Sequence, residues 1–219
     1  NILEAARRVT VEGSDKIHPI VHHSGSSEQY GAVPPDLIPI TENTPIFPAS
    51  PYGVSKHAAD LLCQVYWRRH GLRTIITRAF NHSSPRRADI FVEKVIVNQA
   101  LEIKEGKRKT FTLGNTDSVR DFVDVRDVVD AYYLAVTEPK VQPGTPYNIC
   151  TEIGWKISEV VEEVSRIVGV SAEVEHDPAR MRPSESPVLV GSASKFRIAT
   201  GWTPKHLFAE TLKWIVESS

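Results

Sequence analysis

Apolar positions along the chain fall into short continuous runs that are separated by longer segments with one apolar face. Residues 72–80 (LRTIITRAF) form such a run, while residues 20–31 begin apolar and pass into small hydroxyl residues and a carboxylate. These patterns are typical of buried strands that open into loops. A helix is predicted to begin between them, at Ser50 and Pro51. Strand, helix and strand in this order predict a crossover unit.

The remaining sequence also alternates between predicted helices and strands. Helices are predicted at about 90–105, 127–136, 158–168, 194–200 and 207–216, and strands at 146–150 and 172–175. Asp89 is expected to cap the first of these helices, and Gly169 to end the third. Apolar residues near the end of the chain are expected to pack inward: Phe196, Trp202, Leu207, Leu212 and Trp214.

Composition narrows the class of protein. The chain has 41% hydrophobic and 24% charged residues and a formal net charge of −1, which favours a globular cytoplasmic protein. The near balance of charges argues against a nucleic-acid partner. No run approaches the roughly 18 to 20 apolar residues that cross a bilayer, so no membrane segment is expected. Cys63 and Cys150 lack metal or redox spacing and are predicted to be buried, and no metal site is predicted.

Tyr52 and Lys56 form the first candidate for chemistry. Residues four apart share a helix face, so the phenol and the ammonium are expected to lie one turn apart. A nearby Lys⁺ favours the phenolate, which would let Tyr52 exchange a proton with a substrate hydroxyl or ketone. A solvated helix face with Tyr52 partly in the core is the alternative interpretation.

A polar, proline-rich loop at 177–187 is the second candidate. Arg180, Arg182 and Glu185 cluster there, and such loops often carry binding residues. An ordinary solvated connection is the alternative.

Five motifs occur together in an order that resembles the extended short-chain dehydrogenase/reductases, and within them the branch of GDP-mannose 4,6-dehydratases and GDP-4-keto-6-deoxymannose reductases. The motifs are residues 25–28 (GSSE) followed by Tyr30-Gly31, 50–56 (SPYGVSK), 80–82 (FNH) followed by 85–87 (PRR), 113–115 (LGN) followed by 120–122 (RDF), and 182–185 (RPSE). Together they extend over nearly the whole chain.

The resemblance implies an α/β fold with a doubly wound parallel sheet, of Rossmann type, and a smaller C-terminal substrate domain. Residues 1–80 would be the later part of the dinucleotide-binding domain. Residues 81–219 would mainly bind the nucleotide sugar, with about 125–150 returning to the first domain. NADP or NAD is the implied cofactor, a GDP-sugar the implied substrate, and a homo-oligomer, dimer or tetramer, the implied assembly.

The glycine-rich turn that cradles a dinucleotide phosphate is a point of departure from the family. That fingerprint needs glycines two and three residues apart, whereas the twelve glycines here are never closer than six residues. The chain is therefore expected to be a fragment that lacks the N-terminal half of the Rossmann domain and to be inactive alone.

The catalytic roles implied by the resemblance fall on four residues. Tyr52 would be the acid/base residue, and Lys56 would lower its pKa and hold the nicotinamide ribose. Ser26 would hydrogen-bond the sugar C4 oxygen. Glu28 would remove the C5 proton and return a proton to the departing C6 oxygen.

Binding roles are implied for a further set. His82 and Arg87 would lie at the cofactor, together with Tyr52 and Lys56. Substrate contacts are implied for Ser27, Asn81, Arg120, Arg182 and Glu185. The two arginines 120 and 182 suit a pyrophosphate because guanidinium groups bind phosphate oxygens in pairs.

Three functions stay open on the sequence. Glu28 favours a dehydratase, because a ketone reductase catalyses no elimination. Residues 85–87 are also more similar to the mannose dehydratases. Residues 177–185 and 188–191 are more similar to the 4-keto-6-deoxymannose reductases. A non-catalytic fragment that only binds a nucleotide sugar is the third.

Overall fold

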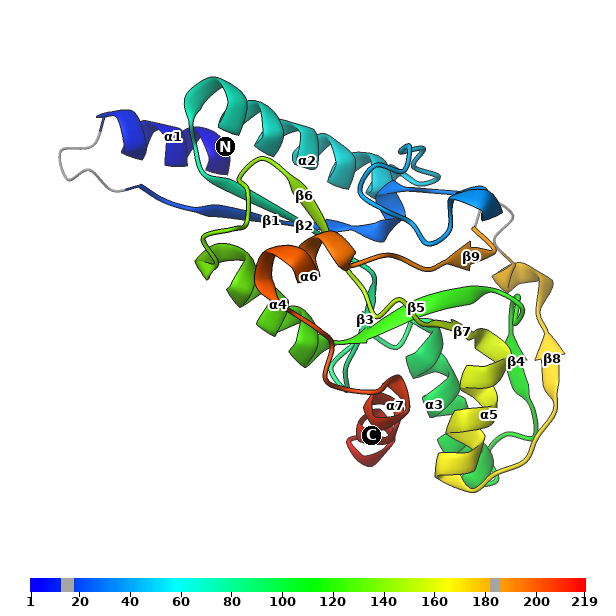
Figure 1. Ribbon diagram of the computed structural model, residues 1–219. Coiled ribbons are helices and arrows are strands. Elements are labelled where there is room, and N and C mark those ends of the chain that lie inside the picture. The colour runs from blue at the N-terminus through cyan, green and yellow to red at the C-terminus, as the bar shows by residue number, and fades with distance from the viewer. Residues whose placement is uncertain (13–17, 182–185) are drawn as a thin grey trace.

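The computed structural model describes residues 1–12, 18–181 and 186–219 of the chain. Its main parallel sheet has the order β1-β2-β6, formed by β1 (Val21–Ser26), β2 (Thr74–Ala79) and β6 (Pro146–Ile149). Helix α2 (Pro51–His70) lies on one face and α4 (Val125–Thr137) on the other, as Figure 1 shows. Helix α1 (Ile2–Glu12) packs beside α2. The predicted crossover unit and α/β class are confirmed.

The second part of the molecule is built around β5 (Val119–Asp124). This strand pairs with β3 (Asn81–Ser83) and β9 (Val188–Leu189) in parallel and with β7 (Gly154–Lys156) in antiparallel fashion. A separate parallel pair joins β4 (Phe111–Leu113) to β8 (Val174–His176). Helices α3 (Val92–Lys104), α5 (Ile157–Val168) and α7 (Phe208–Glu217) pack together beneath these strands (Figure 1).

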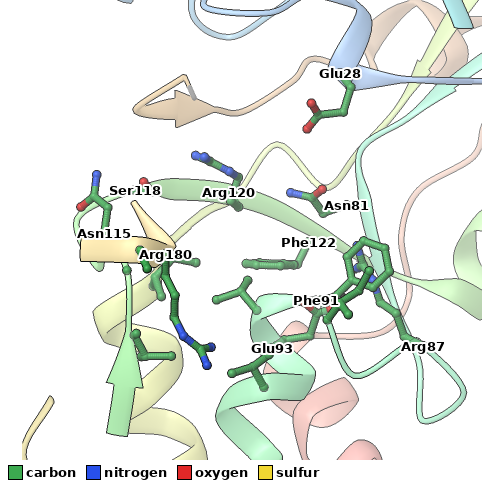
Figure 2. A pocket seen from close by; sticks show the side chains of 17 residues that line it. Glu28, Asn81, Arg87, Phe91, Glu93, Asn115, Ser118, Arg120, Phe122 and Arg180 are labelled. Atoms are coloured by element: carbon green, nitrogen blue, oxygen red, sulfur yellow. Dashed lines mark ion pairs between the residues drawn. The ribbon is translucent and has the colours of Figure 1, made fainter. Parts of the chain in front are cut away.

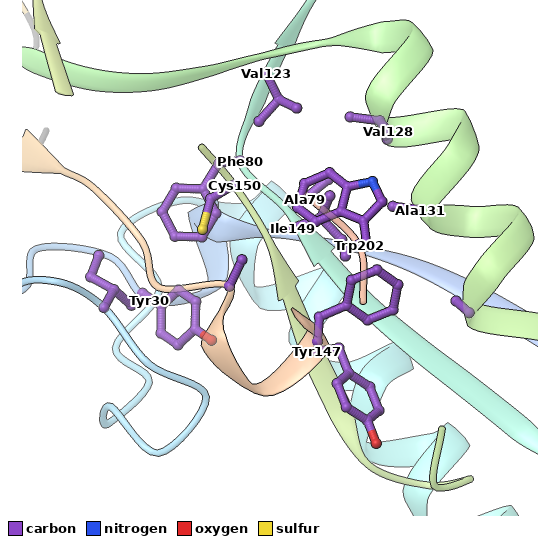
Figure 3. Packing of buried hydrophobic residues seen from close by; sticks show 14 of the residues in the cluster. Tyr30, Ala79, Phe80, Val123, Val128, Ala131, Tyr147, Ile149, Cys150 and Trp202 are labelled. Atoms are coloured by element: carbon purple, nitrogen blue, oxygen red, sulfur yellow. The ribbon is translucent and has the colours of Figure 1, made fainter. Parts of the chain in front are cut away.

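The buried apolar side chains form two clusters. One joins the β1-β2-β6 sheet to α4 and α6 (Ser194–Thr200), and Figure 3 shows Phe80, Cys150 and Trp202 within it. The other lies among α3, α5 and α7, with Phe122 stacked on Phe208 at 4.4 Å between ring centroids. The division into domains at residue 80 stays a prediction.

Local signals located several helix ends correctly. Ser50 accepts a hydrogen bond from Gly53 N at 3.0 Å and caps α2 at the predicted start. The other end of α2, which was not predicted from the sequence, is at Gly71 with φ +65°. Gly169 ends α5 at φ +78°. Cys63 and Cys150 are buried free thiols, as predicted, and burial raises the pKa of Cys63 to about 11.

Other expectations for helices and strands were wrong. Phe91, and not Asp89, stands at the N-cap of α3, because Asp89 instead accepts from Asn98 Nδ2 at 3.1 Å. Helix α4 begins at Val125, capped by Asp124, two residues earlier than predicted. The strand predicted at 172–175 forms at Val174–His176, where its register is set by pairing with β4. Leu207 is 64% exposed because it precedes α7 as its N-cap.

Among the described residues, no helix is both long and apolar enough to cross a membrane.

Candidate active site

The end of β1 turns sharply into a one-turn 3-10 helix, η1 (Ser27–Gln29), that carries the first predicted site residues. Ser26 caps this turn by accepting from Glu28 N at 3.2 Å. Ser27 is buried, whereas Glu28 is exposed. The hydroxyl of Ser26 and the carboxylate of Glu28 are therefore held on one short turn at the carboxyl end of a parallel strand, where ligands bind in open α/β sheets.

Helix α2 approaches this turn at Gly53. A Cβ at position 53 would lie 2.6 Å from the backbone oxygen of Glu28, so only glycine permits the contact. The close approach places the first turn of α2, which carries Tyr52, against the backbone of Glu28. The turn η1 and the start of α2, which are separated by some twenty residues, are therefore in contact, and they carry the predicted acid/base groups.

Tyr52 and Lys56 lie on one face of α2, as the spacing predicted. The Lys56 Nζ atom is 5.7 Å from the centroid of the Tyr52 ring, and it donates to the carbonyl oxygen of Ser24 at 2.9 Å. Tyr52 is 52% exposed. The geometry agrees with a reachable phenol beside an ammonium that is anchored to β1, rather than with a tyrosine of the core.

A pocket of about 430 Å³ opens beside Glu28. Figure 2 shows the side chains that surround it. They come from η1, β3, α3, β4, β5, the start of α5, the turn at Pro178–Arg180 and the segments that precede α3 and β5. The lining residues are Glu28, Asn81, Arg87, Ile90, Phe91, Val92, Glu93, Val95, Leu113, Gly114, Asn115, Ser118, Arg120, Phe122, Ile157, Ala179 and Arg180. Four predicted site residues are brought together here: Glu28, Asn81, Arg87 and Arg120.

The other predicted residues lie outside this lining. Glu28 lines the pocket, and its backbone packs against α2, the helix of Tyr52 and Lys56. Ser26 and Ser27 precede Glu28 in the chain. Glu28 is therefore the residue that joins the pocket to the Tyr52 face.

His82 is also not part of the pocket lining. Its Nδ1 atom lies 3.2 Å from the carbonyl oxygen of Phe80, and the side chain is exposed. Arg182 and Glu185 lie outside the described residues.

Arg120 and Arg180 also line the pocket. Arg120 on β5 is 6% exposed, and its guanidinium donates to the carbonyl oxygens of Val119 at 2.8 Å and Pro187 at 3.4 Å. Arg180 is half exposed and pairs with Asp177 at 3.3 Å. In Figure 2 both side chains border the same space, Arg120 near Asn81 and Arg180 across from Phe91. Guanidinium groups bind anions, so these two side chains are the candidates for an anion site in the pocket.

Arg87 lines the pocket, but its charge is already compensated. Its guanidinium pairs with Glu93 at 2.7 Å, donates to the Ser83 hydroxyl at 3.3 Å and to the carbonyl oxygen of His82, and lies 3.8 Å from the centroid of the Phe91 ring. Burial lowers the pKa of Arg87, while Glu93 opposes that change. The predicted contact of Arg87 with a phosphate or the cofactor stays a prediction. In the structure, Arg87 links Glu93, Ser83 and Phe91 in the wall of the pocket.

Sequence reasoning missed Glu93, the residue that holds Arg87. Glu93 is 1% exposed, and its Oε1 atom also accepts from the Ser83 hydroxyl at 2.7 Å. A glutamate in the first turn of a helix is ordinarily a solvated residue that complements the helix dipole, so the sequence held no signal for this pairing. Asn115 and Ser118 were missed as well, although Asn115 stands in the 113–115 motif.

Comparison with known proteins gives the arrangement a context. A family model described as GDP-mannose 4,6 dehydratase matches residues 1–215. GDP-6-deoxy-D-mannose reductase of Pseudomonas aeruginosa is 35% identical over 192 residues, which cover 87% of this chain and 62% of that protein. GDP-mannose 4,6 dehydratase 2 of Arabidopsis thaliana is 34% identical, over 99% of this chain and 56% of that protein.

Solved structures agree with this comparison. RMD from Pseudomonas aeruginosa complexed with NADPH matches with a TM-score of 0.86 and 32% identity, over 92% of this chain and 67% of that one. A dTDP-glucose 4,6-dehydratase from Bacillus anthracis in complex with NAD matches with a TM-score of 0.84 and 26% identity, over 99% and 64%. The chain spans about 60% of the length of the curated relatives it matches.

Proposed function

The chain belongs to the GDP-mannose 4,6-dehydratase family, and from this premise we propose that it supplies the substrate pocket and the acid/base groups of an enzyme that removes water from GDP-mannose. The product would be GDP-4-keto-6-deoxymannose. The observation that carries the proposal is the position of Glu28, whose exposed carboxylate lines the pocket while its backbone packs against the helix of Tyr52 and Lys56.

Dehydration of a sugar between C5 and C6 requires a base and an acid on the same side of the ring. Once C4 is a ketone, the proton on C5 is acidic enough for a carboxylate to remove. The same carboxylate, now protonated, can give its proton to the C6 oxygen as that oxygen leaves as water. Glu28 is proposed for both steps, and its exposure to the pocket leaves it reachable by a sugar.

Tyr52 is proposed to exchange the proton of the C4 oxygen. Lys56 Nζ lies 5.7 Å from the centroid of the Tyr52 ring and is proposed to hold the nicotinamide ribose. Ser26 is proposed to donate to the same C4 oxygen. NADP or NAD, when bound, supplies the hydride exchange at C4 and C6. The half-exposed Tyr52 ring beside Lys56 fits the nicotinamide end of such a cofactor, with His82 and Arg87 proposed nearby.

The nucleotide part of the substrate is proposed to occupy the pocket between Arg120 and Arg180. A pyrophosphate carries two negative charges, and guanidinium groups bind such oxygens in a bidentate way. Asn81 and Ser27 are proposed to contact the sugar-phosphate region, and Arg182 and Glu185 to complete the binding of the nucleotide. The homo-oligomer stays a prediction. The side chains of Val54, Leu61 and Leu62 on α2 are about half exposed and are the apolar surface proposed for such an interface.

The test is mass spectrometry of the reaction with GDP-mannose. The chain is joined to the N-terminal segment of the Arabidopsis thaliana dehydratase, so that the length of its relatives is restored, and is incubated with catalytic NADP and no added reductant. Loss of one water from the sugar is expected. Glu28→Gln is expected to lower the rate at least about a hundredfold, whereas Glu105→Gln, an exposed carboxylate at the end of α3, is the control and is expected to leave it unchanged.

A second candidate is reduction of GDP-4-keto-6-deoxymannose at C4. The 35% identity to a GDP-6-deoxy-D-mannose reductase and the TM-score of 0.86 to RMD favour it. In the same protein, oxidation of NADPH by the 4-keto sugar without any water loss from GDP-mannose would select the reductase. Tyr52→Phe separates either enzyme from a non-catalytic binder, because only a binder would keep its function.

A further inference from the structure

A buried polar network lies beneath the turn that carries Glu28, and the proposed chemistry does not use it directly. Its centre is an ion pair between Asp60 on α2 and Arg78 on β2, in which Arg78 Nε donates to Asp60 Oδ2 at 2.8 Å. These residues are 0% and 2% exposed. Asp60 follows Tyr52 and Lys56 at intervals of four residues, so the three share one face of α2.

The stability of the fold alone does not explain why Asp60 and Arg78 form a buried ion pair. Removing two charges from water is costly, and well-packed apolar residues of similar size often serve a fold as well or better. The pair is therefore more informative about geometry than about folding energy.

The network contacts the turn of Glu28 at Ser26, Gln29 and Tyr30. The side-chain amide of Gln29, which is fully buried, lies between Asp60 Oδ2 and Ser26 N, at 3.1 Å from each. Only the orientation with the amide nitrogen toward Asp60 and the amide oxygen toward Ser26 N satisfies both neighbours, and in it Gln29 donates to Asp60 and accepts from Ser26. Arg78 donates from Nη1 to the Tyr30 hydroxyl at 2.9 Å, and that hydroxyl donates to Asn148 Oδ1 on β6 at 2.7 Å. Figure 3 shows Tyr30 at the margin of the core.

Glu28 stands between these anchored residues. Its backbone N–H bonds to Ser26 Oγ, and its carbonyl oxygen faces Gly53 at the start of α2. The Asp60–Arg78 pair thus binds the helix of Tyr52 to the strand beneath it, and Gln29 binds the Glu28 turn to the same carboxylate.

We propose that Asp60 is a positioning residue which, through Gln29 and Arg78, fixes the turn of Ser26 and Glu28 relative to the helix of Tyr52 and Lys56. The proposal rests on the acid/base roles given to these groups above. Catalysis by two groups on separate elements depends on a separation held to within a fraction of an ångström, and a network with its hydrogen bonds satisfied supplies that rigidity.

Two variants of the same chemical kind provide the first test. Gln29→Met removes the link between Asp60 and the turn, whereas Gln64→Met removes the other partner of Asp60, whose Nε2 donates to Oδ1 at 2.8 Å from within α2. Hydrogen exchange of the 219-residue chain is the readout. Gln29→Met is expected to speed exchange of the amides at 26–31 about tenfold, with the rest of the sheet unchanged. Gln64→Met is expected to leave those amides as they are.

A double variant tests the ion pair itself. Asp60→Leu with Arg78→Met replaces the pair by apolar side chains, and a merely structural pair would be replaced without local consequence. Faster exchange confined to 26–31, with thermal unfolding within a few degrees of the parent chain, supports positioning. Unchanged exchange in both the double variant and Gln29→Met overturns it. If the double variant fails to fold, Gln29→Met alone decides.

Kinetics in the chain joined to the relative's N-terminal segment provide the second readout. Gln29→Met is expected to lower kcat about thirtyfold while KM for the nucleotide sugar stays within about threefold, because positioning acts on the reacting groups and not on the pocket. A kcat like that of Gln64→Met overturns the proposal. Absence of any turnover in the parent protein would count against the proposed function alone, since the exchange experiment needs no reaction.

Discussion

Glu28 and Glu93 line the same pocket in opposite surroundings. Glu28 is exposed on a turn, whereas Glu93 is 1% exposed and bonded to Arg87 and Ser83. A group that takes and returns a proton must be reachable by the substrate, while a buried, ion-paired carboxylate is suited to holding a wall in place. Residue type alone did not separate these two cases in the sequence, because the difference lies in the partners supplied by other segments.

Glu93→Gln is expected to destabilise the chain strongly. The substitution leaves the guanidinium of Arg87, whose side chain is 14% exposed, without its counter-charge. Breaking a buried pair on one side costs about 3 kcal/mol, and urea unfolding at neutral pH measures the loss. Glu28→Gln is the matched comparison and is expected to change the unfolding free energy by no more than about 0.5 kcal/mol. Equal losses in the two variants would contradict the distinction.

His22 on β1 is expected to make stability depend on pH. Burial, and then the nearby His23, lower the pKa of His22 from 6.5 to about 4. The unfolded chain therefore takes up a proton near pH 6.5, which the folded chain takes up only near pH 4. The free energy of unfolding is therefore unaffected by His22 above pH 6.5 and decreases as the pH falls towards 4. The decrease is about 2 kcal/mol after allowance for partial exposure.

The difference between parent and His22→Gln isolates this effect. Other groups titrate in the same window, including Asp121, whose pKa is raised to about 6 by burial, but they do so in both proteins. The free-energy gap between the two proteins should shift by about 2 kcal/mol between pH 7.5 and pH 4.5. His70→Gln, on the exposed end of α2, is the control. A gap that is independent of pH would refute the assignment.

At the scale of elements, the contact between α2 and the Glu28 turn depends on Gly53. Gly53→Ala would place a methyl group 2.6 Å from the Glu28 carbonyl oxygen. Displacement of the turn is expected, with a cost of about 1 to 3 kcal/mol and a fall in kcat of at least about tenfold. Unfolding and initial-rate measurements test both effects.

Gly71→Ala is the control for this substitution. Gly71 ends the same helix at φ +65°, and a methyl group on its Cα would have no atom within 4 Å, so the cost is confined to backbone strain of about 1 kcal/mol. Its kcat should not change. If Gly53→Ala behaved like Gly71→Ala, the approach of helix and turn would have no part in the reaction.

Element boundaries that depend on residues close in sequence were predicted more accurately than those that depend on contacts between distant segments. Ser50 and Pro51 define the start of α2 through neighbours in sequence, and that prediction was correct. The start of α3 was predicted wrongly because Asp89 bonds to Asn98 instead of capping the helix. The register of β8 is set by its pairing with β4, which lies more than fifty residues away.

Across the whole molecule, the pocket gathers residues from segments that are far apart in the sequence, and no local pattern predicts their meeting. The motif order placed Glu28, Asn81, Arg87 and Arg120 in one site, and the structure brings these four together. The same reasoning left out Glu93 and the network of Asp60, because both depend on tertiary pairing. Roles of Tyr52 and Lys56 rest on a helical spacing that the structure reproduces.

The acid/base role of Glu28 is tested by following solvent deuterium into the sugar. In the proposed reaction Glu28 passes the C5 proton to the departing C6 oxygen, so the new proton at C5 must come from solvent. With GDP-mannose in D2O, the chain joined to a relative's N-terminal segment should form a product that has lost one water and gained one deuterium at C5, and Glu28→Gln should abolish both changes. Water loss without deuterium at C5, or with an undiminished rate in Glu28→Gln, would contradict the assignment of Glu28.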